Sequence, residues 1–338
     1  MKLCAVGDVH GDFAGLYDLI EKIRSRNEGI DTFCVVGDMG IYPRKKDWVW
    51  RLQELKEITA CWPESRFEFI DGNHDDHIAL NTPGFVEELL EQTGWHFRRR
   101  GEYDASTGVL YIGGADSVWF DMASRLVDIC SANELTAHAL LREIDTWPGN
   151  GSIKLAMKPR TTSYGIQDSL DLLNAVRVKK GRNEILNWIH NDHFKRGEKT
   201  FKMLRRMLLQ VEGIKDFRHW SIGEQISRED IDRALAVNGP VKLVISHTAP
   251  QQIVMDKFTL QNQVASVYEP SRHLLAELYE KVKPQKWVMG HWHKYGRIDD
   301  DTTRFTVLDT ISNQINQAGR LLPEGLRQFG LYFEVYEL

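Results

Sequence analysis

Short runs of apolar residues recur along the chain. Close to each run lies a glycine or serine with polar residues around it. The runs are rich in Val, Ile, Phe and Leu and are only four or five residues long. This combination is typical of strands that are buried in a core. The pattern predicts strands at residues 2–6, 32–36, 67–70, 109–112, 241–245 and 286–289, and a last strand within 330–338.

The two segments between the first three runs carry apolar residues at helical spacing. These residues are Phe13, Leu16, Leu19, Ile20 and Ile23 in the first segment and Trp48, Leu52, Leu55 and Ile58 in the second. An apolar stripe of this kind predicts a helix that packs against a core. Strands and helices therefore alternate, which predicts an α/β fold with ligands bound beyond the carboxyl ends of the strands.

Residues of the types that can bind metals follow five of the predicted strands. The motifs are GDVHG at 7–11, GDMG at 37–40, GNHD at 72–75, SHT at 246–248 and GHWH at 290–293. Carboxylate and amide oxygens suit manganese, whereas imidazole suits iron, zinc, cobalt or nickel, so the donor set alone leaves the metal open. Two such ions can activate a shared water for attack on phosphorus, and no Ser-His-Asp or Cys-His signature offers a competing nucleophile.

In this order, the five motifs resemble the D-x-H, G-D, G-N-H-D/E, H and G-H-x-H blocks of the calcineurin-like metallophosphoesterases, and GGADSVW at 113–119 resembles a bacterial and phage-type branch. The resemblance covers roughly 1–119 and 220–310. It implies a two-sheet β-sandwich flanked by helices, with two divalent metals, manganese first among them, and hydrolysis by a metal-bound hydroxide. One metal would be held by Asp8, His10 and His293, the other by Asn73, His247 and His291, with Asp38 between them.

The same resemblance gives roles to the two residues that follow Asn73. His74 would protonate the leaving oxygen or steady the transition state, and Asp75 would orient its ring. The arginine that relatives with a GDxVDRG motif use to bind phosphate has no matching position, since Ile41 and Tyr42 follow GDMG here. Arg44 is a candidate substitute or simply an exposed residue before the next helix. The missing arginine disfavours a Ser/Thr-type protein phosphatase, which stays an alternative function, and a non-catalytic interaction module is another.

Residues 120–219 separate two family blocks and predict an inserted, mainly helical cap on a catalytic domain formed by 1–119 and 220–338. The chain has a net charge of −5, whereas residues 151–220 hold 15 Lys and Arg against 7 Asp and Glu. Such a cap would attract polyanions, with Lys179, Lys180 and Arg182 as candidate phosphate contacts. A nucleotide or nucleic-acid substrate follows from this interpretation; an ordinary solvated helical face or an oligomer interface is the alternative.

Composition adds a prediction about the cellular compartment. The 338 residues include four cysteines, which form no CxxC pair, and no apolar run approaches the roughly 20 residues of a membrane span. The first predicted strand begins at residue 2, which leaves no room for a targeting peptide before it. We therefore expect a cytoplasmic protein with free thiols that does not bind a membrane. Monoesterase or diesterase activity and the oligomeric state stay open.

Overall fold

The computed structural model describes residues 1–26, 29–43, 46–116, 223–253, 270–300, 302–311 and 332–338. All of them belong to one of the two units into which the chain divides, which comprises Met1–Val118 and His219–Leu338. The predicted cap at 120–219 lies outside the described residues, so its boundaries and its helical character stay predictions. In the part that is described, no helix is long and apolar enough to cross a membrane.

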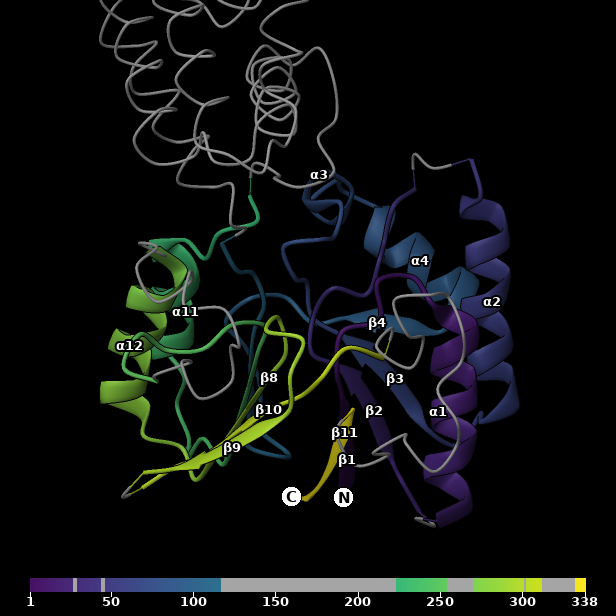
Figure 1. The fold of residues 1–338 in the computed structure, drawn as a ribbon. Helices are drawn as coiled ribbons and strands as arrows, with labels where there is room; N and C mark the ends of the chain where they lie inside the picture. Colours follow the sequence, from purple (N-terminus) through teal and green to yellow (C-terminus); the bar gives the residue numbers. More distant parts are fainter. Residues whose placement is uncertain (27–28, 44–45, 117–222, 254–269, 301, 312–331) are drawn as a thin grey trace, which may run out of the picture. The chain divides into compact units, whose positions relative to one another are not determined.

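The first sheet has five strands in the order β11-β1-β2-β3-β4 (Figure 1). These strands are β11 (Phe333–Glu337), β1 (Lys2–Val6), β2 (Thr32–Val35), β3 (Arg66–Phe69) and β4 (Trp95–Phe97). β1 to β4 run parallel, and β11 pairs antiparallel with β1. The connecting helices are α1 (Phe13–Arg26), α2 (Trp48–Cys61), α3 (His77–Leu80) and α4 (Phe85–Thr93). Because β1, β2 and β3 are parallel, the loops that follow them leave the same edge of the sheet.

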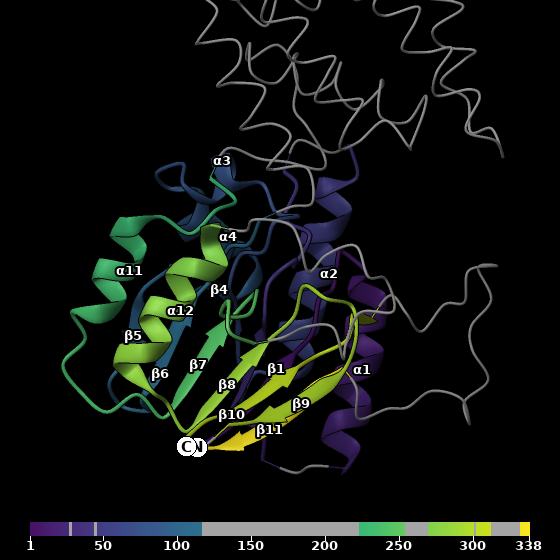
Figure 2. The ribbon, with the colours of Figure 1, turned by 60° about the vertical axis from the view of Figure 1, so that its left-hand side comes forward.

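The second sheet has six strands in the order β5-β6-β7-β8-β10-β9 (Figure 2). They are β5 (Glu102–Asp104), β6 (Val109–Ile112), β7 (Leu243–Ser246), β8 (Lys286–Met289), β10 (Arg304–Val307) and β9 (Gly296–Asp299). The four central strands are parallel, whereas β5 and β9 run antiparallel at the two edges. Two helices, α11 (Arg228–Leu235) and α12 (Pro270–Val282), pack on this sheet.

Alternating side chains place the two sheets face to face. Leu3 and Ala5 of β1 pack in one buried cluster with residues of the second sheet, such as Tyr111 and Ile245. The neighbouring residues of β1 point the other way, into a cluster with α1, α2 and α4. This period of two is what a strand buried on both faces requires. The described unit is thus a two-sheet β-sandwich with helices on its outer faces, which confirms the predicted fold class.

The predicted strands agree closely with the observed ones. β1 and β8 begin and end at the predicted residues, β2 and β3 differ by one residue, and β7 begins two residues later than predicted. Both predicted helices are present as α1 and α2. The hydrophobic pattern does not predict α3, α4, α11, α12 or the short strands β4, β5, β9 and β10.

Candidate metal centre

The five motifs meet at one place, beyond the carboxyl ends of strands from both sheets. Asp8 and His10 follow β1, Asp38 follows β2, and Asn73 follows β3, all in the first sheet. From the second sheet, the loop after β7 supplies His247, and the loop after β8 supplies His291 and His293. Asp8 and His293, which are 285 positions apart in the chain, thereby face one another.

Four of these side chains form a group that can hold a metal ion. One ligand atom from each of Asp8, His10, Asp38 and His293 lies within 4.8 Å of the others. Nε2 of His293 lies 2.9 Å from Nε2 of His10 and 3.3 Å from Oδ2 of Asp8. Nε2 of His10 is 3.7 Å from Oδ2 of Asp38. Two imidazole nitrogens and two carboxylate oxygens form a donor set that suits a divalent transition metal.

A second group of potential ligands converges on Asn73. Its Oδ1 atom lies 3.2 Å from Nε2 of His247 and 2.9 Å from Nδ1 of His291. Nε2 of His247 also lies 3.3 Å from Oδ1 of Asp38. The other ring nitrogen of His247, Nδ1, is 2.9 Å from the carbonyl oxygen of Val36. Because a carbonyl only accepts, Nδ1 carries a proton and Nε2 is the atom left to face a cation.

Asp38 is shared by the two groups, with Oδ1 in one and Oδ2 in the other. Its side chain is 1% exposed, and among the described residues Oδ2 has no hydrogen-bond partner although it is buried. A buried carboxylate oxygen without a donor is costly unless a cation satisfies it. The arrangement therefore fits two divalent ions with Asp38 between them.

The backbone at this centre is held in a conformation that most residues avoid. Of the described non-glycine residues, five have a positive φ angle, and four of these are His10 (52°), Asp38 (49°), His291 (69°) and His293 (50°). Positive φ costs energy for residues with a Cβ atom, and such strain concentrates at functional sites. The loops also press together, since a Cβ atom on Gly40 would lie 2.3 Å from the backbone nitrogen of Gly11.

The charges of the centre are strongly coupled. Burial disfavours the charged form of His247, but the carboxylates of Asp38 and Asp8 raise its pKa to about 10. Burial also opposes ionisation of Asp38, yet His247 holds the pKa of that carboxyl well below its ordinary value. Burial, reinforced by the charge of His247, lowers the pKa of His291 to about 3. Two ionised carboxylates in a buried setting make the centre attractive to cations.

His74 lies at the edge of the first group rather than inside it. The centroids of the His74 and His10 rings are 5.3 Å apart in an edge-on arrangement. The backbone N–H of His74 donates to Oδ1 of Asp38 at 2.7 Å, which fixes the start of this residue against the centre. The ring is thus close to the candidate metal ligands without sharing their contacts.

Asp75 holds backbone groups together. Its carboxylate accepts hydrogen bonds from the N–H groups of Gly40 (2.8 Å), Ile41 (2.9 Å) and Gly72 (2.9 Å). These bonds join the loop after β2 to the loop after β3. Within the described residues no hydrogen bond connects Asp75 to the His74 ring, so its role in orienting that ring stays a prediction. Burial and the neighbouring Asp38 raise the pKa of Asp75 to about 6.

The four candidate substrate contacts, Arg44, Lys179, Lys180 and Arg182, lie outside the described residues. The structure instead shows the side chain of Arg51 beside the first motif. The sequence pattern gave no sign of this contact. Nη1 of Arg51, on α2, donates to the carbonyl oxygen of Gly11 at 3.0 Å, one residue after His10. Nothing in the local sequence distinguishes Arg51 from other helix-surface arginines, because the contact depends on how α2 packs.

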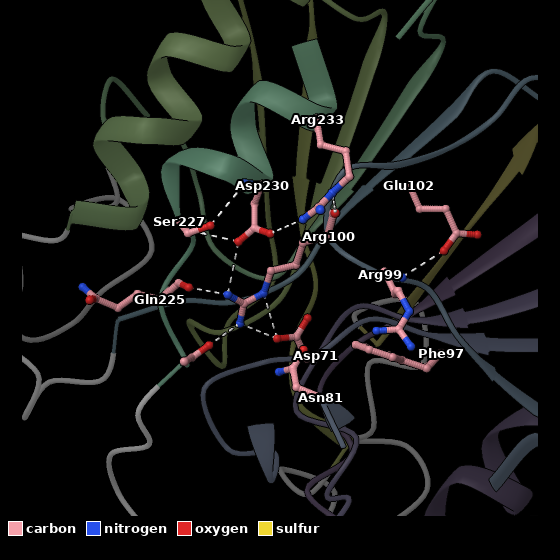
Figure 3. Close-up of a pocket in the computed structure, with 11 residues that line it drawn as sticks. Asp71, Asn81, Phe97, Arg99, Arg100, Glu102, Gln225, Ser227, Asp230 and Arg233 are labelled. Atoms are coloured by element: carbon pink, nitrogen blue, oxygen red, sulfur yellow. Dashed lines mark hydrogen bonds and ion pairs between the residues drawn. The ribbon is translucent and has the colours of Figure 1, made fainter. Parts of the chain in front are cut away.

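A pocket of about 510 Å³ lies next to the loop that carries Asn73 (Figure 3). Arg100 and Asp71 form part of its wall, together with Arg99, Asp230 and Arg233. None of the candidate metal ligands lines this pocket. It is therefore separate from the metal centre, although Asp71 precedes Asn73 by only two residues.

Comparisons with known proteins bear on the same segments. The family model described as calcineurin-like phosphoesterase matches residues 1–295, a range that contains all five motifs. Among solved structures, the chain is similar to the phosphopantetheinyl hydrolase from Mycobacterium tuberculosis. That similarity has 13% sequence identity and a TM-score of 0.32, and it covers 93% of this chain and 91% of that chain. No protein with a curated description matches the chain.

Proposed function

The chain belongs to the calcineurin-like phosphoesterase family, and from this premise we propose that it is a metal-dependent hydrolase that cleaves a phosphomonoester or phosphodiester. The observation that carries the proposal is the division of the Asp38 carboxylate between two groups of ligand atoms. A carboxylate whose two oxygens face separate sets of donors is placed to join two cations. Both sets are complete here, since the family motifs have lost none of their ligand residues.

We assign the metal ligands as the two groups indicate. Asp8, His10 and His293 hold one ion, whereas Asn73, His247 and His291 hold the other. Bound divalent ions supply an activated water and neutralise negative charge on the phosphoryl oxygens. Manganese is the ion that we propose, and iron, zinc, nickel and cobalt remain candidates because the donor set mixes oxygen and nitrogen.

His74 is the residue that we propose as the proton donor. Its ring lies beside His10 but does not share the contacts of the ligand groups, so it stays available for proton transfer. A positioned imidazole can give a proton to the leaving oxygen as the phosphorus–oxygen bond breaks. The hydrogen bond from its backbone N–H to Asp38 fixes the backbone of His74 next to the metal centre.

A nucleotide or nucleic acid is the substrate class that we propose. The excess of basic residues at 151–220, with 15 Lys and Arg against 7 Asp and Glu, supports a polyanionic substrate.

The three described cysteines, Cys4, Cys34 and Cys61, are free thiols, which supports the proposal that the protein works in the cytoplasm.

The test is an activity panel with protein reconstituted with Mn²⁺. The substrates are para-nitrophenyl phosphate, bis-para-nitrophenyl phosphate, 2′,3′-cyclic nucleotides, end-labelled RNA and DNA, and a phosphopeptide. We expect hydrolysis of at least one nucleotide or nucleic-acid substrate, with activity lost in Asp38→Asn and kept in Asp104→Asn, a carboxylate on the edge strand β5. Hydrolysis of the phosphopeptide alone would instead favour the protein phosphatase, and no hydrolysis by metal-loaded protein would sink the enzyme assignment.

A further inference from the structure

Arg100 and Asp71 form a buried ion pair directly before the loop that presents Asn73. Nε of Arg100 donates to Oδ2 of Asp71 at 3.0 Å, and Nη2 donates to the same oxygen. The side chains are 12% and 3% exposed. Figure 3 shows the Arg100 guanidinium directed at the Asp71 carboxylate. Asp71 is the second residue after β3, and only Gly72 separates it from Asn73.

The same guanidinium is bound on its other sides to the segment before α11. Nη2 donates to the carbonyl oxygens of Gly223 at 2.7 Å and Glu224 at 3.1 Å, and Nη1 donates to that of Gln225. Arg100 therefore ties the loop after β3, which belongs to the first sheet, to a segment that packs on the second sheet. Because its donors are used on both sides, the guanidinium fixes the distance between the two segments.

Asp71 is fixed through its backbone as well. Its carbonyl oxygen accepts from the N–H of Gly114 at 2.8 Å, just after β6. The next two hydrogen bonds along the loop belong to the metal centre. The N–H of Gly72 donates to Asp75 at 2.9 Å, and the N–H of His74 donates to Asp38 at 2.7 Å. A rotation or shift at Asp71 would be passed to Asn73 through Gly72 alone, whose N–H is held by Asp75.

Asn73 is the ligand that is most sensitive to such a shift. It is the residue whose Oδ1 lies between His247 and His291, at 3.2 and 2.9 Å from their ring nitrogens. An amide oxygen carries only a partial charge, so it attracts a cation less strongly than a carboxylate at the same distance. Small displacements of Asn73 therefore weaken cation binding in its group. Among the described residues, no hydrogen bond joins Asp8, His10 or His293 to residues 71–74, and the loop meets their group through the bond from the His74 N–H to Asp38.

We propose that Arg100 is a positioning residue that holds Asn73 at the metal centre through Asp71. The proposal rests on the proposed function, because it assigns Asn73 as a ligand of one of two bound ions. It goes further by adding a residue that is not among the candidate ligands and lies outside the five motifs. Partners of this kind, placed behind a ligand, usually change metal affinity by about 10- to 100-fold when they are removed.

The chain contains a matched control for a purely structural role. Arg98 is also 12% exposed and pairs with a buried acid, since its Nη2 lies 2.6 Å from Oε1 of Glu68, which is 2% exposed. Glu68 lies within β3, and its other oxygen accepts from the hydroxyl of Tyr111 at 3.0 Å. In the part of the chain that the structure describes, no hydrogen bond joins this pair to the loop at 72–74. Removing either arginine takes the guanidinium away from a buried carboxylate that keeps one weaker partner, His77 beside Asp71 and Tyr111 beside Glu68, and should cost stability in both cases.

The experiment compares Arg100→Met with Arg98→Met in the full chain. Mn²⁺ titration by calorimetry, with metal content after dialysis, gives the affinity and number of ions. We expect both variants to lower the melting temperature, but only Arg100→Met to weaken one of two ions, by about 10- to 100-fold. Arg100→Lys should recover part of the affinity, because an ammonium group can still pair with Asp71 but cannot bridge to all three carbonyls.

A second measurement needs no metal. Hydrogen exchange of the Gly72 and His74 amides in metal-free protein should become faster in Arg100→Met and stay near the unsubstituted rate in Arg98→Met. Equal effects of the two substitutions on affinity and exchange would overturn the positioning role. If the unsubstituted protein bound no ions at all, the proposed function would fail instead, and the exchange rates would still decide whether Arg100 orders this loop.

Discussion

Oδ1 of Asp38 lies 3.3 Å from Nε2 of His247, while the second oxygen of the same carboxylate faces the other ligand group. His247 comes from the second sheet and Asp38 from the first. A single side chain at the meeting point of the sheets therefore takes part in both groups. This relationship makes Asp38 the residue whose removal should have the broadest effect.

Asp38→Asn should weaken the binding of both ions, since an amide oxygen replaces a charged one in each group. We expect a loss larger than the roughly 10- to 100-fold that is typical of residues behind a ligand. Asn73→Ala should weaken mainly one ion. Calorimetric titration with Mn²⁺ distinguishes the two results, and two intact sites in Asp38→Asn would refute the shared position.

His74→Ala should leave metal content unchanged and lower turnover by about 10²- to 10⁴-fold, the range typical of a lost proton donor. The ring lies next to His10 but is not part of either ligand group. Metal content and kcat measured on the same sample check this separation. His96→Ala provides the control, because His96 is a partly exposed residue of β4. Loss of metal from His74→Ala would show that the ring is a ligand.

Arg272→Lys should destabilise the protein by about 2–4 kcal/mol, because its buried guanidinium donates to several acceptors that an ammonium group cannot all reach. Arg272 donates to the carbonyl oxygens of Ala249, Pro250, Gln251 and Ile253 at 2.8–3.4 Å. Its Cζ also lies 5.3 Å from the centre of the Trp292 ring. In the sequence, Trp292 stands between two candidate metal ligands, His291 and His293. Urea unfolding measures the free energy, and an unchanged midpoint with an unchanged slope would contradict this expectation.

Glu102 should contribute stability that the protein loses in acid. Burial raises its pKa, but the imidazole of His96 at 3.9 Å and hydrogen bonds from Arg98 and the Arg99 N–H outweigh burial and lower the pKa from 4.5 to about 2. A lowered pKa in the folded state gives stability that is fully present above pH 4.5 and is lost as the pH falls through about 2. Allowing for the partial exposure of the side chain, the contribution is about 1–2 kcal/mol.

Glu102→Gln should remove this contribution, so its unfolding free energy should fall less between pH 5 and pH 2 than that of the unsubstituted protein. Urea unfolding at several pH values provides the measurement. Glu87→Gln serves as the control, because Glu87 is 70% exposed and its nearest cation, on Arg99, is 3.9 Å away. Parallel pH profiles for Glu102→Gln and the unsubstituted protein would show that the Arg98 pair does not stabilise the fold.

Strands that are buried on both faces could be predicted from the sequence, whereas partly exposed ones could not. β1 and β8 consist almost wholly of buried apolar residues, so their limits follow from the apolar run itself. β9 has one buried residue in four and contains charged side chains, so it lacks such a run. It becomes a strand because it pairs with β10, and that pairing depends on contacts with the rest of the sheet.

The candidate metal ligands can be identified from the sequence alone, because each lies within a few residues of a strand end and belongs to a short motif. How those motifs face one another, and which oxygen of Asp38 faces which histidine, depends on tertiary contacts. The same contacts bring Arg100, and not Arg98, to Asp71. The pairing of β3 with β4, with Phe69 opposite Phe97, sets that choice. Contacts across 29 residues follow from sheet register, which no local pattern of hydrophobic and polar residues encodes.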